Sequence, residues 1–162
     1  MINYRISSIK DHELSACLET IHSAFRVNCE RFGFTKKNYP SCAAFMTLDE
    51  LKQEKESGTH IYGAWVGDKL VGSVQIKKDE TRTYTFKRFA VLPEYQHGGI
   101  GKALVAHCID RATTYGGVAI RLLMVYENEK LRSFYESFGF RLTKTARDDA
   151  HPFLFGIYEL EL

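Results

Sequence analysis

The chain has 162 residues, of which 44% are apolar and 26% charged, close to the average for globular proteins. This composition argues against disorder, and the length favours one domain spanning residues 1–162. Lys and Arg total 22 and Asp and Glu total 20, so the net charge is +2. So small an excess predicts no extended polyanion-binding surface and no nucleic-acid partner, and any anion site must be local.

The N-terminal residues and the cysteines bear on location and metal content. Residues 1–14 contain no signal-peptide core, and no stretch approaches the roughly 20 apolar residues that cross a bilayer. We therefore expect a cytoplasmic protein without a membrane partner. The cysteines are widely spaced and form no CxxC pair, which favours free thiols and no metal site. They are Cys17, Cys29, Cys42 and Cys108.

The first third of the chain predicts a strand and two helices. Residues 4–6 read as a short strand, and Asp11 is expected to cap a helix. Apolar side chains fall at helical spacing at Leu14, Leu18, Ile21 and Phe25. Residues 28–46 have no clear period. Thr47 and Glu50 match a capping box, so a second helix should begin there and end at Gly58.

The remaining elements alternate between strands and helices. Strands are predicted at 60–66, 69–77, 83–92, 118–126, 140–144 and 153–160, and helices at 100–115 and 129–138. Gly67-Asp68 is a good two-residue hairpin turn between the first two of these strands. The order predicts an α/β fold with a mixed sheet.

A glycine-rich bend lies between the strand ending near Pro93 and the next helix. Gly98, Gly99 and Gly101 let several backbone N–H groups point into one concavity, and the helix start adds unpaired amides. His97 and Lys102 can reinforce the rim. This pattern predicts a phosphate or pyrophosphate site, although a plain capped turn would also use a glycine.

The bend does not match the common nucleotide-binding motifs. A P-loop needs glycine at position 96 and a hydroxyl at 103, where this chain has Gln96 and Ala103. A dinucleotide fingerprint needs a third glycine where Leu104 stands. The segment 84–89 interleaves aromatic and basic residues, but it lacks the glycine of an RNA-binding RNP1 motif, so we interpret it as an exposed strand face.

Two motifs resemble those of the GNAT superfamily of N-acetyltransferases. Residues 96–103, QHGGIGKA, match the (Arg/Gln)-x-x-Gly-x-(Gly/Ala) signature, and residues 134–140, FYESFGF, resemble the second motif of that family. The resemblance implies a single GNAT-like domain with a mixed, mostly antiparallel sheet of about six to seven strands. About four helices flank the sheet, and the central pair of strands splays apart.

The resemblance also implies a cofactor site for acetyl-CoA, used as a cosubstrate without a metal. The signature loop would bind the pyrophosphate, the strand before it would pair with the pantetheine arm, and an N–H near Val91 would face the thioester carbonyl. The implied cofactor-binding residues are Phe89, Ala90, Val91, Gln96, His97, Gly98, Gly99, Ile100, Gly101, Lys102 and Asn128.

The catalytic groups are less sharply defined. Tyr135 resembles the general acid of the family, whose phenol protonates the departing thiolate, but it also lies on the apolar stripe of its helix. The central strand has Thr85 and Lys87 where many relatives place a glutamate base. Glu127 is the candidate base, and Glu94 is a second possibility.

The implied reaction is direct acetyl transfer to a primary amine, on a small molecule or a peptide, within a ternary complex. The alternative is a CoA-binding regulatory module that has lost turnover. We expect residues 28–46, with their aromatic side chains and Lys36 and Lys37, to select the acceptor. A homodimer is also compatible with the sequence, with residues 153–160 pairing across the interface.

Overall fold

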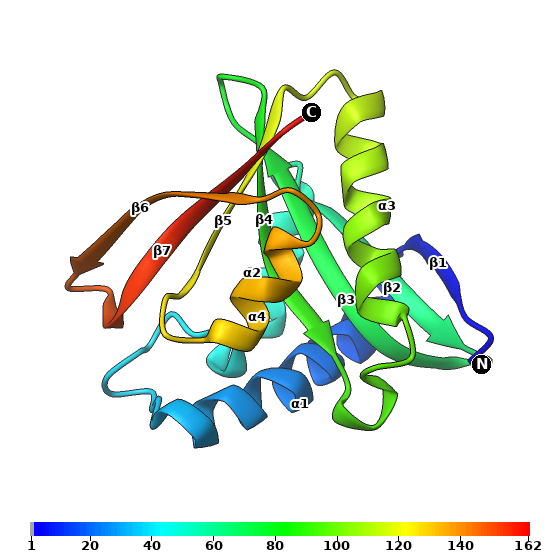
Figure 1. Cartoon of the computed structure of the whole chain (residues 1–162). Coiled ribbons are helices and arrows are strands. Elements are labelled where there is room, and N and C mark those ends of the chain that lie inside the picture. The colour runs from blue at the N-terminus through cyan, green and yellow to red at the C-terminus, as the bar shows by residue number, and fades with distance from the viewer. Residues whose placement is uncertain (1) are drawn as a thin grey trace.

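Seven strands form one sheet in a computed structural model that describes residues 2–162 (Figure 1). The strand order is β1-β2-β3-β4-β5-β7-β6, and every neighbouring pair is antiparallel except β4 and β5. The strands are β1 (Arg5–Ser8), β2 (His60–Val66), β3 (Lys69–Lys78), β4 (Thr83–Val91), β5 (Ala119–Val125), β6 (Arg141–Asp148) and β7 (His151–Glu161). The expected mixed, mostly antiparallel sheet is confirmed.

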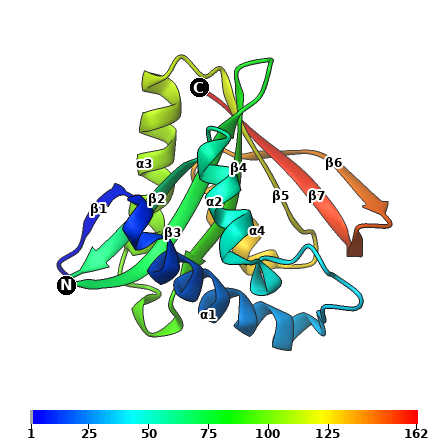
Figure 2. The same cartoon turned by 180° about the vertical axis from the view of Figure 1, so that it is seen from behind.

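Four α-helices cover the two faces of this sheet. They are α1 (Leu14–Phe32), α2 (Leu48–Glu56), α3 (Ile100–Thr114) and α4 (Glu129–Glu136). Figure 1 shows α3 and α4 on one face, and Figure 2 shows α1 and α2 on the other. Each pair buries a separate apolar core against the sheet, and one core is centred on α3 and the other on α1. The sheet therefore has two covered faces.

The N-terminal helix differs from the prediction at both ends. Asp11 does not cap α1. It begins a short 3-10 turn, and its carboxylate pairs with Lys55 of α2. The helix also continues to Phe32, so the first part of the segment predicted to be irregular is helical. Gly33 then ends it with a left-handed φ of 68°, a conformation that glycine adopts at little cost.

The second helix begins and ends as predicted. The Thr47 hydroxyl accepts a hydrogen bond from the Glu50 N–H at 3.2 Å, which satisfies one free donor of the first turn. The helix ends at Glu56, two residues before Gly58, which has a φ of 100°.

The central parallel strands splay apart after a short contact. Three residue pairs join them, the last of which is Thr85 with Arg121. Beyond that pair, residues 86–91 of β4 have β3 on one side and no strand partner on the side of β5. This confirms the expected splayed pair, and it leaves main-chain hydrogen-bonding groups of β4 free for another partner.

A bulge distorts β4 within this splayed part. Arg88 and Phe89 together stand opposite Val74 of β3, and Arg88 has a left-handed φ of 55°. A non-glycine residue in this conformation carries strain of about 1 kcal/mol or more. As a result, Arg88 reaches α2, where it binds Glu54, whereas Phe89 packs on the face covered by α4.

The C-terminal strand is internal. β7 lies between β5 and β6, so it does not offer the free edge that pairing of residues 153–160 across an interface requires. That expectation is wrong, because β6 takes the edge position instead. Among residues 2–162, no helix combines the length and the apolar character of a membrane span.

Candidate active site

The loop before α3 presents a row of free backbone donors. His97 and Gly99 both have left-handed φ values, 66° and 88°, which turn successive N–H groups toward the start of the helix. Within residues 2–162, no hydrogen bond uses the N–H groups of residues 97–102. A run of free amides at a helix N-terminus is suited to bind phosphate oxygens. The loop thus has the chemistry that the glycine bend predicted.

Gln96 has a structural role in this loop. Its side-chain amide donates a hydrogen bond to the Val91 carbonyl at 3.1 Å, which ties the loop to the end of β4. His97 and Lys102 are exposed at the rim, where their side chains could reach an anion. Gln96 therefore shapes the site, whether or not it also contacts the ligand.

Gly101 lies at a close approach between α3 and β4. A Cβ atom there would lie 3.2 Å from the Cζ atom of Phe89, which is closer than side chains normally approach. Phe89 is in turn stacked on Phe134 of α4, with the ring centroids 5.8 Å apart. The small residue lets α3 approach the splayed strand. At Gly99, by contrast, space is open and the backbone conformation is the constraint.

Phe89, Ala90 and Val91 form the end of the unpaired part of β4. The side chains of Ala90 and Val91 are buried, and the pairing with β3 occupies only one edge of the strand. The other edge can therefore pair with an extended ligand. The loop at 97–102 follows directly, so one ligand could bind both surfaces.

Tyr135 lies beside the point where β4 and β5 separate. Its ring contacts four aromatic rings, two from β4 and two from residues near α4: Phe86, Phe89, Phe134 and Phe140. The residue is 4% exposed, and no side-chain hydrogen bond of its hydroxyl is found within residues 2–162. Burial raises the pKa of the phenol far above its ordinary value. The hydroxyl is thus a protonated donor with no partner in the chain.

Asn128 and Glu127 differ in their surroundings. Asn128 is buried, and its carbonyl oxygen accepts a hydrogen bond from the Leu131 N–H at 3.2 Å, which caps α4. Glu127 is exposed, and its carboxylate makes no hydrogen bond or ion pair within residues 2–162. The cap explains part of the Asn128 environment, whereas no side-chain contact in the described part of the chain holds the Glu127 carboxylate in place.

The segment expected to select the acceptor packs against β7. Phe34 and Tyr39 lie in the loop after α1, and each contacts Phe153 with ring centroids 5.2 and 5.5 Å apart. Tyr39 also meets the ring of His151, whose Nδ1 atom is 2.8 Å from Asp148 Oδ1. Lys36 and Lys37 are exposed. The aromatic rings hold the loop against the β6–β7 hairpin.

Sequence analysis missed a polar cluster between α2 and β4. The Glu54 Oε1 atom lies 2.8 Å from Arg88 Nη2 and 3.7 Å from Lys87 Nζ. Burial lowers the pKa of Lys87, and neighbouring cations add to this effect while Glu54 opposes it. The expectation that the charges of residues 84–89 form an exposed strand face is therefore wrong, because Lys87 and Arg88 are half-buried and share the Glu54 carboxylate.

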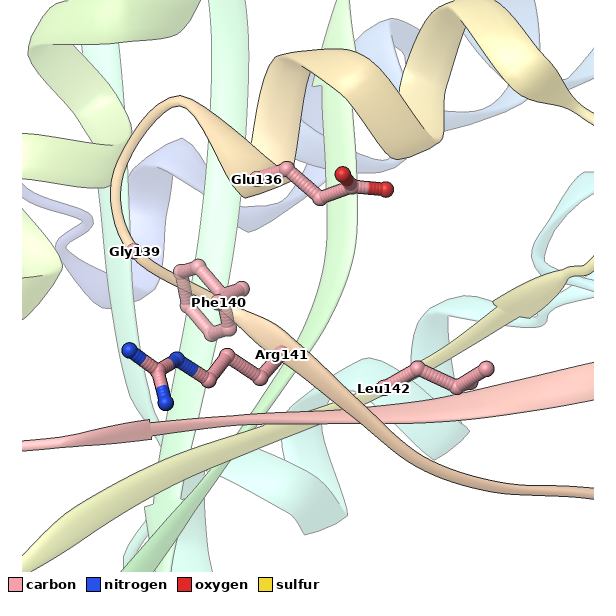
Figure 3. A pocket seen from close by; sticks show the side chains of 5 residues that line it. All are labelled: Glu136, Gly139, Phe140, Arg141 and Leu142. Carbon is pink, nitrogen blue, oxygen red and sulfur yellow. The ribbon is translucent and has the colours of Figure 1, made fainter.

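Two surface depressions lie elsewhere. One is lined by Lys78–Thr81, in the turn between β3 and β4. The other, at the turn from α4 into β6, is lined by Glu136, Gly139, Phe140, Arg141 and Leu142 (Figure 3). Neither contains a predicted cofactor-binding or catalytic residue.

Comparisons with known proteins agree with this geometry. A Bacillus subtilis protein described as the uncharacterized N-acetyltransferase YvbK is 31% identical over 87 residues. The match spans 54% of this chain and 56% of that relative, which is about half of its length.

Solved structures share the whole fold. The ribosomal-protein-S18-alanine N-acetyltransferase of Escherichia coli superposes with a TM-score of 0.78 at 20% identity, over 98% of this chain and 94% of that one. The PaiA N-acetyltransferase of Thermoplasma acidophilum, in complex with coenzyme A, gives a TM-score of 0.77 at 18% identity, over 99% and 100%. Residues 18–140 match the Acetyltransferase (GNAT) family, and the chain, with its splayed strands and the loop before α3, belongs to that family.

Proposed function

We propose that this protein transfers the acetyl group of acetyl-CoA to a primary amine by direct attack within a ternary complex. The observation that carries the proposal is the continuous surface formed by the free N–H groups of residues 97–102 and the unpaired edge of β4. A diphosphate fits the first part, and the amides of a pantetheine arm fit the second.

The residues of the chain would orient the cosubstrate as follows. The amides of residues 97–102 would hold the diphosphate, with His97 and Lys102 at the rim. The free edge at residues 89–91 would pair with the pantetheine amides. An N–H near Val91 would then donate to the thioester oxygen, where negative charge develops. Acetyl-CoA supplies an acyl group already activated as a thioester.

The transfer needs two proton movements. The amine nitrogen forms a bond to the acetyl carbon as the carbon–sulfur bond breaks, and the sulfur leaves with the electron pair. Tyr135 would donate its hydrogen bond, and finally its proton, to the departing sulfur. Because burial raises the pKa of Tyr135, the phenol is protonated when the thioester binds and can donate a hydrogen bond to the departing sulfur.

The second proton leaves the attacking amine. Glu127 would accept it directly or through water, from an exposed position at the end of β5. Glu54 is a second candidate, because it lies half-buried against the splayed strand. Glu127→Gln and Glu54→Gln separate these roles. The variant that removes the base should lower kcat and recover activity as pH rises, since the amine then loses its proton to solvent.

The test is release of the CoA thiol from acetyl-CoA in the presence of amines, amino acids and peptides. Isothermal titration of CoA and amide exchange at residues 97–102 report on binding. Turnover together with protection of this loop supports the proposal. Tight CoA binding without turnover on any acceptor would favour the regulatory module, for which the exposed Glu127 is the one supporting observation. Absence of CoA binding would contradict both functions.

A further inference from the structure

The cluster between α2 and β4 contains an unusual share of unmatched polar atoms. Eight buried side-chain nitrogen or oxygen atoms lack a hydrogen-bond partner within residues 2–162, and four of them belong to three residues of this region. They are Glu54 Oε2, Arg88 Nε and both amide atoms of Gln75. Buried polar groups are normally paired with protein or with ordered water, and these four atoms have no such partner within residues 2–162.

Lys87 connects these residues. It stands opposite Gln75 in the register of β3 and β4, and its ammonium lies 3.7 Å from the Glu54 carboxylate. Arg88 binds the same carboxylate oxygen, so two cations share one oxygen and leave the other without a partner. The Arg88 and Glu54 side chains are 21% and 20% exposed, although their unmatched atoms, Arg88 Nε and Glu54 Oε2, are themselves buried.

The position of the cluster connects it to the acceptor. Arg88 occupies the bulge and precedes Phe89, at the start of the segment proposed to hold the pantetheine arm. Arg88 turns toward α2, whereas Phe89 turns toward α4. The amides that would bind the diphosphate are at the start of α3, on the face covered by α3 and α4. An acceptor that meets the thioester from the opposite face would therefore pass Arg88 and Glu54.

The unmatched atoms define the chemistry of the partner. Arg88 Nε is a donor that suits a carboxylate, and Glu54 Oε2 is an acceptor that suits an ammonium group. These two atoms belong to one ion pair. A single ligand that binds both atoms must therefore carry its carboxylate and its ammonium group close together. Two cations against one carboxylate also leave the cluster with a positive excess, which favours an acceptor with an acid group.

We propose that the acceptor is an amino acid with a free carboxylate, which Arg88 binds through Nε while Glu54 Oε2 receives the amino group. This inference rests on the proposed acetyl transfer. In the transfer, the amino nitrogen forms its bond to the acetyl carbon, the CoA sulfur leaves, and Glu54 takes the proton released by nitrogen. Arg88 selects the substrate and takes no part in proton transfer.

The experiment compares kcat/KM for two matched pairs of acid and amide: glycine with glycinamide, and L-alanine with L-alaninamide. L-Glutamate, a diamine and a short peptide extend the panel of acceptors. The amide amine is less basic and more deprotonated at neutral pH, so amine reactivity alone favours the amide. We expect the acid to be favoured at least about tenfold in the native protein, the factor typical of one charge-assisted hydrogen bond.

Variants assign that preference to one side chain. Arg88→Gln should bring the acid-to-amide ratio close to one while CoA affinity and the melting temperature stay near native values. Arg111→Gln is the matched control, because Arg111 pairs with Asp110 on the last turn of α3. The control should keep the native ratio. A merely structural role for Arg88 would lower both rates together and leave their ratio unchanged.

The outcomes separate the two proposals. Turnover of amides, diamines or peptides as fast as acids would overturn the amino acid inference and leave acetyl transfer standing. A preference for acids that survives in Arg88→Gln would overturn the assignment to Arg88. No turnover on any member of the panel, with CoA still bound, would overturn acetyl transfer itself and the inference with it.

Discussion

The ring of Tyr135 meets the ring of Phe86 nearly edge to face, at 83°, with the centroids 5.7 Å apart. Phe86 is the first residue of β4 after Thr85, the last residue that pairs with β5. This contact places Tyr135 at the branch point of the sheet, where the unpaired edge of β4 begins. A helical residue on an apolar stripe is thereby brought to the place where the reactive end of a pantetheine arm would lie.

Tyr135→Phe should lower kcat about a hundredfold and leave CoA affinity within about twofold, because the ring packing is kept and only the donor is lost. Steady-state kinetics and calorimetry with CoA measure the two effects. Tyr84→Phe is the matched control, because Tyr84 is a buried tyrosine of β4, in the part of that strand that pairs with β5. Equal losses of turnover and affinity in Tyr135→Phe would assign the residue to packing.

The two glycines of the loop should respond differently to substitution. At Gly99 the φ of 88° makes any side chain strained, and at Gly101 the new side chain would displace Phe89. We expect Gly99→Ala to weaken CoA binding by disturbing the free amides, at a stability cost of about 1 kcal/mol. Gly101→Val should weaken binding and also lower the melting temperature strongly, through overpacking of the core.

Gly58→Ala is the control for backbone strain alone. Gly58 has a φ of 100°, open space around its Cα atom, and a position after α2. The Gly58→Ala variant should lose as much stability as Gly99→Ala and should bind CoA with native affinity. If Gly99→Ala also binds CoA normally, the loop is not the diphosphate site.

The loop before α3 and the free edge of β4 could be predicted because their sequence signals are local or come with the family resemblance. The glycines at 98–101 and the strand before them are contiguous, and main-chain amides need no particular side chain. The splayed strands and the position of Tyr135 followed from the family resemblance and from the helical spacing of residues 131–138. The close approach of Gly101 to Phe89 could not be predicted from the sequence, because it depends on how α3 packs on β4.

The polar cluster between α2 and β4 could not be predicted in the same way, because its groups come from distant elements. Glu54 lies 34 residues before Arg88, and only the left-handed φ of Arg88 turns its side chain to α2. A bulge at a non-glycine residue has no signature in the sequence. Periodicity alone therefore gave an exposed charged face where the structure has a half-buried ion cluster.

Lys87 should make stability depend on pH in the alkaline range. Its folded pKa is lowered by burial, and also by Arg88 and Lys77, from the ordinary 10.5, while Glu54 opposes the shift. Between the folded pKa and 10.5 the unfolded chain binds more protons, so this contribution makes stability rise with pH. Below that window Lys87 is charged in both states, and the penalty is constant.

Lys87→Met should accordingly be more stable than the native protein at neutral pH, and this advantage should shrink as pH approaches 10.5. Urea unfolding at several pH values measures it. Lys52→Met, at an exposed position of α2, is the control and should show no such trend. An advantage independent of pH would mean that desolvation of the Lys87 charge is not the cause.

The cap of α2 should have a measurable effect on stability. Thr47→Ala removes the acceptor for the Glu50 N–H and should cost about 1 kcal/mol, or roughly 2–4 °C in melting temperature. Ser23→Ala, at an exposed position within α1, is the control and should be neutral or slightly stabilising. Equal melting temperatures for Thr47→Ala and the native protein would show that α2 is held by its packing alone.

Phe153 should matter for the acceptor and not for the cosubstrate. It joins the β6–β7 hairpin to the loop after α1 through Phe34 and Tyr39, on the side of the sheet away from α3. Phe153→Ala should release this loop and raise KM for the acceptor several-fold, because loop ordering is then left to the binding step. CoA affinity should not change, since none of its proposed contacts involves this cluster.

Phe25→Ala is the control for loss of an aromatic ring, because Phe25 is on α1 and partly buried in the same layer. This variant should lower stability with an unchanged acceptor KM. A parallel rise of KM in both variants would show that the loop after α1 does not select the acceptor.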